Sequence, residues 1–269
     1  MIKVIASDMD GTFLNDQGTF DAKQFQDQLN RMKNKGMHFV VASSDPYSHL
    51  LKLFKDVDGP ISYICNNGAA VFDERGVIVS ETTIDPLMVQ KAVSFVLSSP
   101  KFAGVQIVIS SRDGDYTNLK ADSKKFKASQ YFYENLQSVP DIKLVFNQVY
   151  KIDLYWNDDK DVSEQQAELQ NKFNRDLNIF SSGLGGVDIN ASGLNKMTAL
   201  NQLLDQWDLT AENAAAFGDN GNDFDLINGV KEGYAVQNAA KDLSNIVDNQ
   251  LDLSNNQAAV QEKIEEYLK

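Results

Sequence analysis

Apolar residues near the start of the chain come in short runs, each followed by polar residues. Residues 4–6, 37–42 and 61–65 are largely apolar, which is typical of strands buried on both faces of a sheet. Residues 21–35 lie between the first two runs and have apolar positions at helical spacing, with Gly36 as a stop signal. This alternation of strand and helix predicts an α/β fold with a mostly parallel sheet.

The pattern changes near residue 83. Alternating apolar positions at 105, 107 and 109 predict a strand with one buried face, whereas residues 110–118 form a polar stretch. Further segments predicted here are helices at 85–97, 122–136 and 162–174, a strand at 150–156 and two short strands up to 189. The strands resemble antiparallel ones, and about one hundred residues is a typical domain size, so this part predicts an inserted α+β domain.

The α/β pattern returns with a helix predicted at 194–207 and continues to the end of the chain. We therefore predict two domains. Residues 1–82 and 190–269 would form the core domain, and residues 83–189 would form the inserted domain.

Composition narrows the class of protein. Of the 269 residues, 42% are apolar and 23% are charged, as in ordinary globular proteins. The formal net charge of −13 disfavours nucleic acid and anionic membranes as partners. The apolar runs are shorter than the roughly 20 residues that a membrane span needs, and the first residues lack a signal-peptide pattern. The single cysteine, Cys65, cannot form an internal disulfide, so we expect a cytoplasmic protein; the oligomeric state stays open.

Two acidic segments carry the chemistry of the chain. Asp8-Met9-Asp10-Gly11-Thr12 follows the first apolar run, and Gly218-Asp219-Asn220-Gly221-Asn222-Asp223 follows the apolar run 214–217. If the two strands are neighbours, their carboxyl ends meet at one edge of the sheet and the carboxylates converge. Such a group needs a cation, and a divalent metal ion is the obvious candidate. A calcium loop of the EF-hand type is excluded, because its sixth position, which requires glycine, would be Phe13 or Phe224.

The residue types within these segments suggest how they could act. Asp8 and Asp10 are two apart, so on an extended backbone both side chains lie on the same side, and Met9 points away. One carboxylate can then serve as nucleophile and the other as general acid. Simple alternatives are an Asx turn for the first segment and helix N-capping by Asp219 or Asp223 for the second. N-capping explains one or two of these residues but not the run of six.

Three further residues are candidates for binding a phosphate group. Ser43 and Ser44 directly follow the run 37–42 and offer hydroxyl and backbone N–H donors. A plain turn before a proline is a simpler interpretation of these two residues. Lys196 lies at the start of the helix predicted at 194–207, where a cation opposes the helix dipole by about 0.3–1 kcal/mol. A bound phosphate would remove this conflict, but an exposed lysine at this position is also commonplace.

Asp8 to Thr12, Ser43, Lys196 and Gly218 to Asp223 occur in the order of the four motifs of the haloacid dehalogenase superfamily. The chain resembles the Cof-like, class IIB phosphatases of this superfamily, and residues 66–69 and 237–239 are similar to further stretches of them. The resemblance implies a Rossmann-like, doubly wound parallel sheet core. It also implies that the insert is an α+β cap that closes over the site and selects the substrate.

The resemblance also implies roles for individual residues. Asp8 would attack phosphorus and become a phosphoaspartate, and Asp10 would protonate the leaving oxygen and later deprotonate water. Mg²⁺ would be held by the Asp8 carboxylate, the Asp10 backbone carbonyl and Asp219, with support from Asp223. Phosphoryl oxygens would be held by Ser43, Lys196, Asn222 and the backbone N–H of Met9.

The function implied is a Mg²⁺-dependent phosphatase of small phosphorylated metabolites, such as sugar phosphates, that works through a phosphoaspartate. A phosphomutase or phosphotransferase of the same fold stays open, as does a regulator that binds phosphorylated metabolites without turnover. One departure from the superfamily matters, because Ser44-Asp45 stands where glycine and a basic residue are frequent. If Asp45 lies near the entrance, we expect a preference for monophosphates with neutral or cationic leaving groups.

Overall fold

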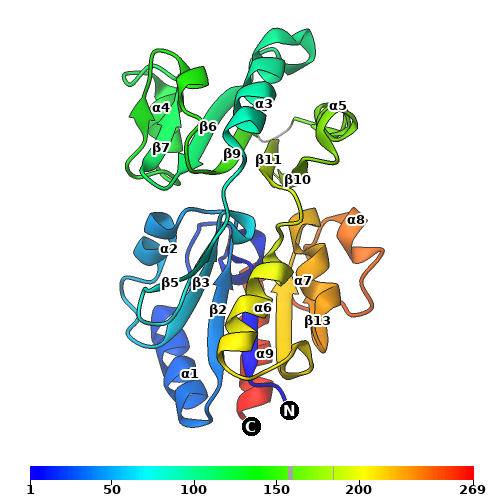
Figure 1. Cartoon of the computed structure of the whole chain (residues 1–269). Helices are drawn as coiled ribbons and strands as arrows, with labels where there is room; N and C mark the ends of the chain where they lie inside the picture. Colours follow the sequence, from blue (N-terminus) through cyan, green and yellow to red (C-terminus); the bar gives the residue numbers. More distant parts are fainter. Residues whose placement is uncertain (157–159, 184) are drawn as a thin grey trace. The chain divides into compact units, whose positions relative to one another are not determined.

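The computed structural model describes residues 1–156, 160–183 and 185–269 (Figure 1). These residues divide into two compact units. One consists of Met1–Glu81 and Asn195–Lys269, and the other of Thr82–Leu194. The chain therefore leaves the first unit once and returns to it once.

The first unit is built on a seven-stranded sheet in the order β13-β12-β1-β2-β3-β4-β5. Its parallel strands are β1 (Val4–Ser7), β2 (His38–Ala42), β3 (Ile61–Cys65), β12 (Ala214–Gly218) and β13 (Glu232–Ala235). β4 (Ala70–Phe72) and β5 (Ile78–Glu81) add an antiparallel edge. The prediction of an α/β fold with a mostly parallel sheet is confirmed.

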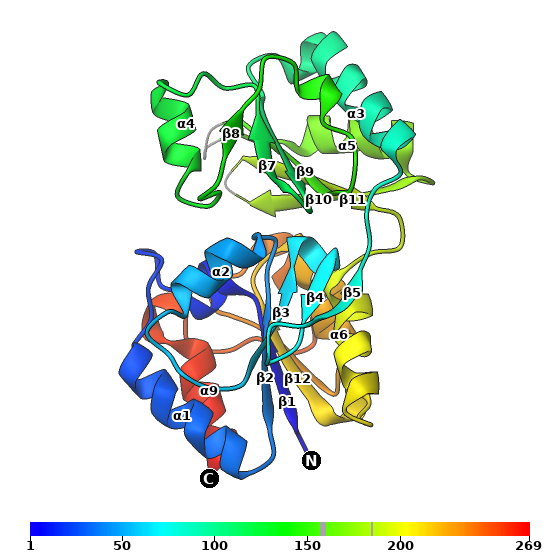
Figure 2. The same ribbon diagram turned by 60° about the vertical axis from the view of Figure 1, so that its left-hand side comes forward.

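Helices cover both faces of this sheet (Figure 2). The helices of the unit are α1 (Ala22–Asn34), α2 (Tyr47–Leu53), α6 (Lys196–Gln206), α7 (Phe224–Gly229), α8 (Lys241–Ser244) and α9 (Ala259–Leu268). α6 and α7 pack on one face, where Leu200 and Leu226 contact strand residues such as Ala216. α1, α2 and α9 lie on the other face, where the ring of Phe25 packs against Phe39. Neither face of these strands contacts solvent, which explains their unbroken apolar runs.

The second unit has a six-stranded sheet in the order β10-β11-β9-β6-β7-β8. Its elements are β6 (Gln106–Ser111), β7 (Gly114–Thr117), β8 (Gln137–Ser138), β9 (Val149–Tyr155), β10 (Leu177–Gly183), β11 (Gly186–Ala191), α3 (Pro86–Ser98), α4 (Lys124–Ser129) and α5 (Ser163–Phe173). All the pairings are antiparallel except β7 with β8. α3 and α5 share an apolar cluster with one face of the sheet, so this unit has an α+β arrangement.

Two predictions about the second unit are wrong, one on the burial of β6 and one on the helix at 122–136. β6 is buried on both faces, because Val108 packs against Phe126, Tyr133 and Leu136 on the face opposite the main apolar cluster. The polar stretch 110–118 contains a strand, β7. The helix predicted at 122–136 ends at Ser129. Its apolar residues would share one helical face, but the chain turns twice so that β8 can pair with β7.

The second unit extends beyond the predicted range 83–189, because β11 continues to Ala191 in its pairing with β10. The assignment of the two units as catalytic core and cap stays a prediction.

Within the ranges described, none of the helices has the length and the apolar character that crossing a membrane requires.

Candidate functional site

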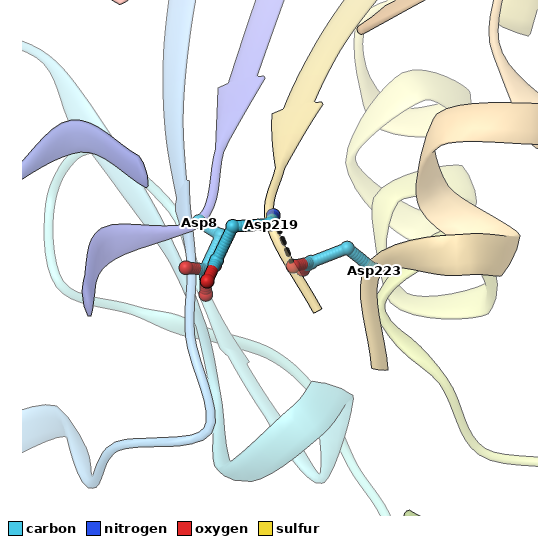
Figure 3. A group of neighbouring side chains, drawn as sticks. All are labelled: Asp8, Asp219 and Asp223. Atoms are coloured by element: carbon cyan, nitrogen blue, oxygen red, sulfur yellow. Dashed lines mark hydrogen bonds between the residues drawn. The ribbon is translucent and has the colours of Figure 1, made fainter. Parts of the chain in front are cut away.

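The two acidic segments lie side by side at the carboxyl ends of neighbouring strands. β1 pairs with β12 in parallel, with Ser7 opposite Phe217, so Asp8 and Asp219 begin adjacent loops (Figure 3). Oxygen atoms of Asp8, Asp219 and Asp223 lie within 4.8 Å of one another. Of the four carboxylates expected to converge, Asp8, Asp219 and Asp223 form one group, so the prediction is confirmed for three of them.

The Lys196 side chain lies among these carboxylates. Its Nζ donates to Asp8 Oδ1 at 2.6 Å and to Asp223 Oδ1 at 2.7 Å, and the residue is 0% exposed. Burial disfavours the ammonium, but Asp223 and Asp8 outweigh burial and raise the pKa of Lys196. The reading of Lys196 as an exposed lysine is therefore wrong. Two buried carboxylates compensate for its unfavourable position at the first residue of α6.

Asp223 uses both of its carboxylate oxygens within the protein. Oδ1 accepts from Lys196, and Oδ2 accepts from the backbone N–H groups of Asp219 (3.0 Å) and Asn220 (3.1 Å) (Figure 3). The capping interpretation therefore accounts for part of the Asp223 role. Asp223 therefore holds the backbone at the start of this loop.

Asp8 and Asp219 are crowded carboxylates. Burial raises the pKa of Asp8 to about 7, with a further increase from Asp223, while Lys196 and the Met9 backbone N–H oppose the rise. Burial and the charges of Asp8 and Asp223 raise the pKa of Asp219 well above its usual range, although its Oδ1 accepts from Thr12 Oγ1 at 2.9 Å. Two repelling carboxylates supply the oxygen ligands that a divalent cation prefers, so the residues fit such an ion.

Gly11 provides the space for Asp219. Its φ angle is +77°, and a Cβ atom built on it would lie 2.6 Å from Asp219 Oδ2. Any side chain at position 11 would therefore be strained and would push the carboxylate away.

Asp10 is separate from the three clustered carboxylates. Residues Met9–Phe13 form one π-helical turn in which Asp10 keeps extended angles (φ −69°, ψ 124°) and Met9 is buried. Asp10 is exposed as a residue. Even so, the protein around its carboxyl, the charges of Asp45 and Asp8, and a side-chain hydrogen bond with Asp45 raise its pKa to about 8. A carboxyl group that keeps its proton near neutral pH can act as a general acid.

Asp45 is a buried carboxylate beside the candidate site. It is only 6% exposed, its backbone N–H donates to Ser43 Oγ at 3.0 Å, and its Oδ2 lies 3.9 Å from His49 Nε2. Its contact with Asp10 places its charge beside the acid group. The expected preference for neutral or cationic leaving groups stays a prediction.

The remaining candidates lie on the loops after β2 and β12. Ser43 is buried and Ser44 is partly exposed at the carboxyl end of β2, which neighbours β1. Asn222 is buried, and its Nδ2 donates to Asn67 Oδ1 at 3.1 Å. This bond joins the loop after β12 to the loop after β3.

Asn67 is absent from the site residues that the motifs single out. It lies in the turn Asn66–Gly68, in which all three residues have positive φ angles. Its N–H donates to Ser43 O at 3.0 Å, so the turn is tied to the serine loop as well as to Asn222. The available signal was the sequence Asn-Asn-Gly, because asparagine and glycine tolerate left-handed backbone angles best.

Comparisons with known proteins agree with this geometry. A family model described as haloacid dehalogenase-like hydrolase matches residues 5–264. The chain is 29% identical, over 239 residues, to the 5-amino-6-(5-phospho-D-ribitylamino)uracil phosphatase YbjI of Escherichia coli (strain K12), covering 88% of this chain and 86% of that protein. It is 25% identical to the phosphatase YcsE of Bacillus subtilis (strain 168), which carries the same substrate in its name, over 88% of this chain and 85% of the relative. The solved structure of SMU.1108c from Streptococcus mutans UA159 has a TM-score of 0.89 and 30% identity, covering 100% of this chain and 99% of that one.

Replacement of Gly11 by alanine tests the space beside Asp219. We expect Gly11→Ala to weaken the binding of a divalent cation by about tenfold or more, because the new Cβ displaces Asp219 Oδ2. Titration calorimetry with Mg²⁺ or Mn²⁺ measures this affinity. Gly36→Ala is the matched control, since it has a similar φ of +62° but no atom within 4 Å of the added Cβ. Equal cation affinity in the Gly11→Ala variant and the wild type would contradict the interpretation.

Replacement of Lys196 by methionine tests the buried ion pairs. We expect Lys196→Met to lower the free energy of unfolding by about 3–5 kcal/mol, since Asp8 and Asp223 lose the cation that compensates for their burial. Denaturant unfolding gives the value. Lys231→Met removes an exposed pair with Glu212 and should change stability by only about 0–1 kcal/mol. Similar losses of unfolding free energy in the two variants would show that the buried ion pairs stabilise the protein no more than an exposed pair does.

Proposed function

The chain is a phosphatase that belongs to the haloacid dehalogenase-like hydrolase family, and we propose that it hydrolyses small phosphate monoesters with Mg²⁺ through a phosphoaspartate at Asp8. One observation carries the proposal. Asp8, at the carboxyl end of a central strand, has Lys196 bonded to one oxygen and the carboxylate of Asp219 close by. This arrangement provides a nucleophile, a cation and an oxygen ligand for a metal at one point.

Asp8 is the nucleophile. The bond from Lys196 favours the ionised form and fixes Oδ1, so Oδ2 is the oxygen that attacks phosphorus. In this step an oxygen–phosphorus bond forms to Asp8, and the ester oxygen–phosphorus bond breaks. The leaving oxygen takes a proton, and the phosphoryl group stays on the protein.

Asp10 is the general acid and base. Its raised pKa keeps a proton available for the leaving oxygen of the ester. The carboxylate that results takes a proton from water, and the water oxygen attacks the phosphoaspartate. Inorganic phosphate leaves, and Asp8 and Asp10 return to their starting states.

The acidic cluster fits a divalent metal, for which we propose Mg²⁺. The Asp8 and Asp219 carboxylates and the Asp10 backbone carbonyl would hold the ion. Asp223 would support the site through the loop, because both of its oxygens already accept hydrogen bonds from the protein. When bound, the ion neutralises charge on the phosphoryl group that is transferred.

Donors around Asp8 would orient the phosphoryl oxygens. The proposed donors are the ammonium of Lys196, the Ser43 and Ser44 groups, the Asn222 amide and the Met9 backbone N–H. Asn67 acts indirectly in this proposal, since it fixes the Asn222 amide.

Relatives suggest which substrate to test first. Two of them are named as 5-amino-6-(5-phospho-D-ribitylamino)uracil phosphatases, and a third, from Yersinia pseudotuberculosis, as an HMP-PP phosphatase. We propose a polyol monophosphate with an uncharged leaving group as the first candidate. The negative charge of Asp45 beside Asp10 supports this choice, since an anionic leaving group would be repelled there.

We also propose that the protein is cytoplasmic, that it binds neither nucleic acid nor membranes, and that residues 83–189 act as a cap. A phosphotransferase or a non-catalytic regulator also stays open, and the products of the reaction distinguish these alternatives from hydrolysis.

The proposal is tested by phosphate release from a panel of monoesters that includes the ribityl phosphate, with Mg²⁺ and with a chelator. We expect release that needs the metal and is lost in Asp8→Asn, because the amide cannot attack phosphorus. With an ester whose leaving group needs no proton, such as p-nitrophenyl phosphate, Asp10→Asn should accumulate a phosphorylated protein, detected by intact mass, because no base activates water. Phosphate release by Asp8→Asn at the wild-type rate would refute the mechanism. Transfer of the group to an alcohol instead of water would favour the transferase alternative.

A further inference from the structure

The turn that carries Asp10 has few backbone hydrogen bonds of its own. Met9–Phe13 is a single π-helical turn closed by Leu14 N–H, which donates to Met9 O at 2.9 Å. Asp10 and Gly11 have non-helical angles, so they do not continue a regular ladder. Carbonyl groups at the end of such a turn need partners from elsewhere.

Side-chain amides from the last part of the chain supply these partners. Asn238 Nδ2 donates to Gly11 O at 2.7 Å, and Asn255 Nδ2 donates to Leu14 O at 3.0 Å. Gln261 Nε2 donates to Phe13 O at 3.3 Å. Three carbonyls directly after Asp10 are thus held by residues more than two hundred positions away in the sequence.

The amides are also bonded to one another and to the next loop. Asn238 Oδ1 accepts from the Asn255 backbone N–H at 2.9 Å, and Asn255 Nδ2 also donates to Asp16 Oδ1 at 3.0 Å. Asn256 Nδ2 donates to Asp16 Oδ2 at 2.8 Å, and Asn256 Oδ1 accepts from Asp16 N–H at 3.0 Å. The network therefore holds the chain from Gly11 to Asp16, directly after Asp10, and its bonds to the Asp16 carboxylate are charge-assisted.

The burial of these amide side chains indicates that they do more than fill space. Asn255 is 3% exposed and Gln261 is 2% exposed. The Oε1 atom of Gln261 is buried and makes no hydrogen bond in the part of the chain that the structure describes. An unpaired buried polar atom costs about 1–3 kcal/mol, which an apolar residue of similar size would avoid. What the amide adds is the donation to the carbonyl of Phe13.

We propose that Asn238, Asn255 and Gln261 are positioning residues that hold the acid–base group Asp10 in register with Asp8. The inference rests on the proposed function. Asn238 fixes the Gly11–Thr12 peptide group, one residue beyond Asp10, and Asn255 and Gln261 fix the end of the same turn. A displacement of about 1 Å at a reacting group lowers a rate by roughly one-hundred-fold, so the turn has to be held firmly.

Asn238→Asp is the first variant, because the residue is exposed and the substitution keeps its shape while the donor becomes an acceptor that repels Gly11 O. Asn255→Asp and Gln261→Glu make the same change at the buried positions. We expect kcat to fall roughly 10- to 100-fold, with KM changed by less than about threefold. We also expect faster hydrogen–deuterium exchange in a peptide that covers residues 8–16. Asn201→Asp, an exposed site on α6, is the matched control and should change neither quantity.

The outcomes separate this inference from the proposed function. If the wild-type protein hydrolyses no ester of the panel, the proposed function fails and this inference fails with it. If the wild type is active and kcat of the folded Asn238→Asp variant is unchanged, the inference alone is overturned, whatever the exchange shows. A loss of thermal stability in Asn255→Asp with kcat per folded molecule unchanged would likewise reduce the network to a structural role. A fall in kcat together with faster exchange at residues 8–16 supports positioning.

Discussion

The ammonium group of Lys196, buried between Asp8 and Asp223, is the interaction on which the rest of the site depends. None of these three charges could be buried alone, because an isolated ion loses far more solvation than the protein returns. Each comes from a different element: Asp8 follows β1, Asp223 precedes α7, and Lys196 begins α6. The ion pairs therefore form only when β1, β12, α6 and α7 are in their native arrangement. Correct folding and formation of the site thus depend on each other.

The sheet order brings the loops to one edge. In the order β12-β1-β2-β3, the loops that follow four parallel strands lie next to each other, and the bond between Asn222 and Asn67 links the outer two. Small residues make this edge possible. Gly11 leaves room for Asp219, and a Cβ on Gly218 would lie 2.3 Å from Asp223 Cβ. The glycines, which have no side chain, thus lie where the carboxylates are close together.

The contacts of the turn Met9–Phe13 with residues 238–261 bring the last part of the chain into the candidate site. The local sequence of the turn sets its shape through Gly11, and carbonyls at the end of the turn accept from side chains far away in the sequence. Amide side chains suit this task, because they donate to a carbonyl without adding charge to a region that is already strongly negative.

The sequence by itself determined four of the five parallel strands, the helix that contains α6 and the positions of the two acidic segments, because unbroken apolar runs, helical spacing and glycines act over short distances. It did not determine the end of α4, since Phe126, Tyr133 and Leu136 are spaced as in a helix and only the pairing of β8 requires the turn. Nor did it determine the burial of Asp45 or the contact between Asn255 and Leu14. Those features depend on which segments the fold brings together from distant parts of the chain. A local sequence pattern shows that a residue is buried or hydrogen-bonded, but it does not identify the residue that it contacts.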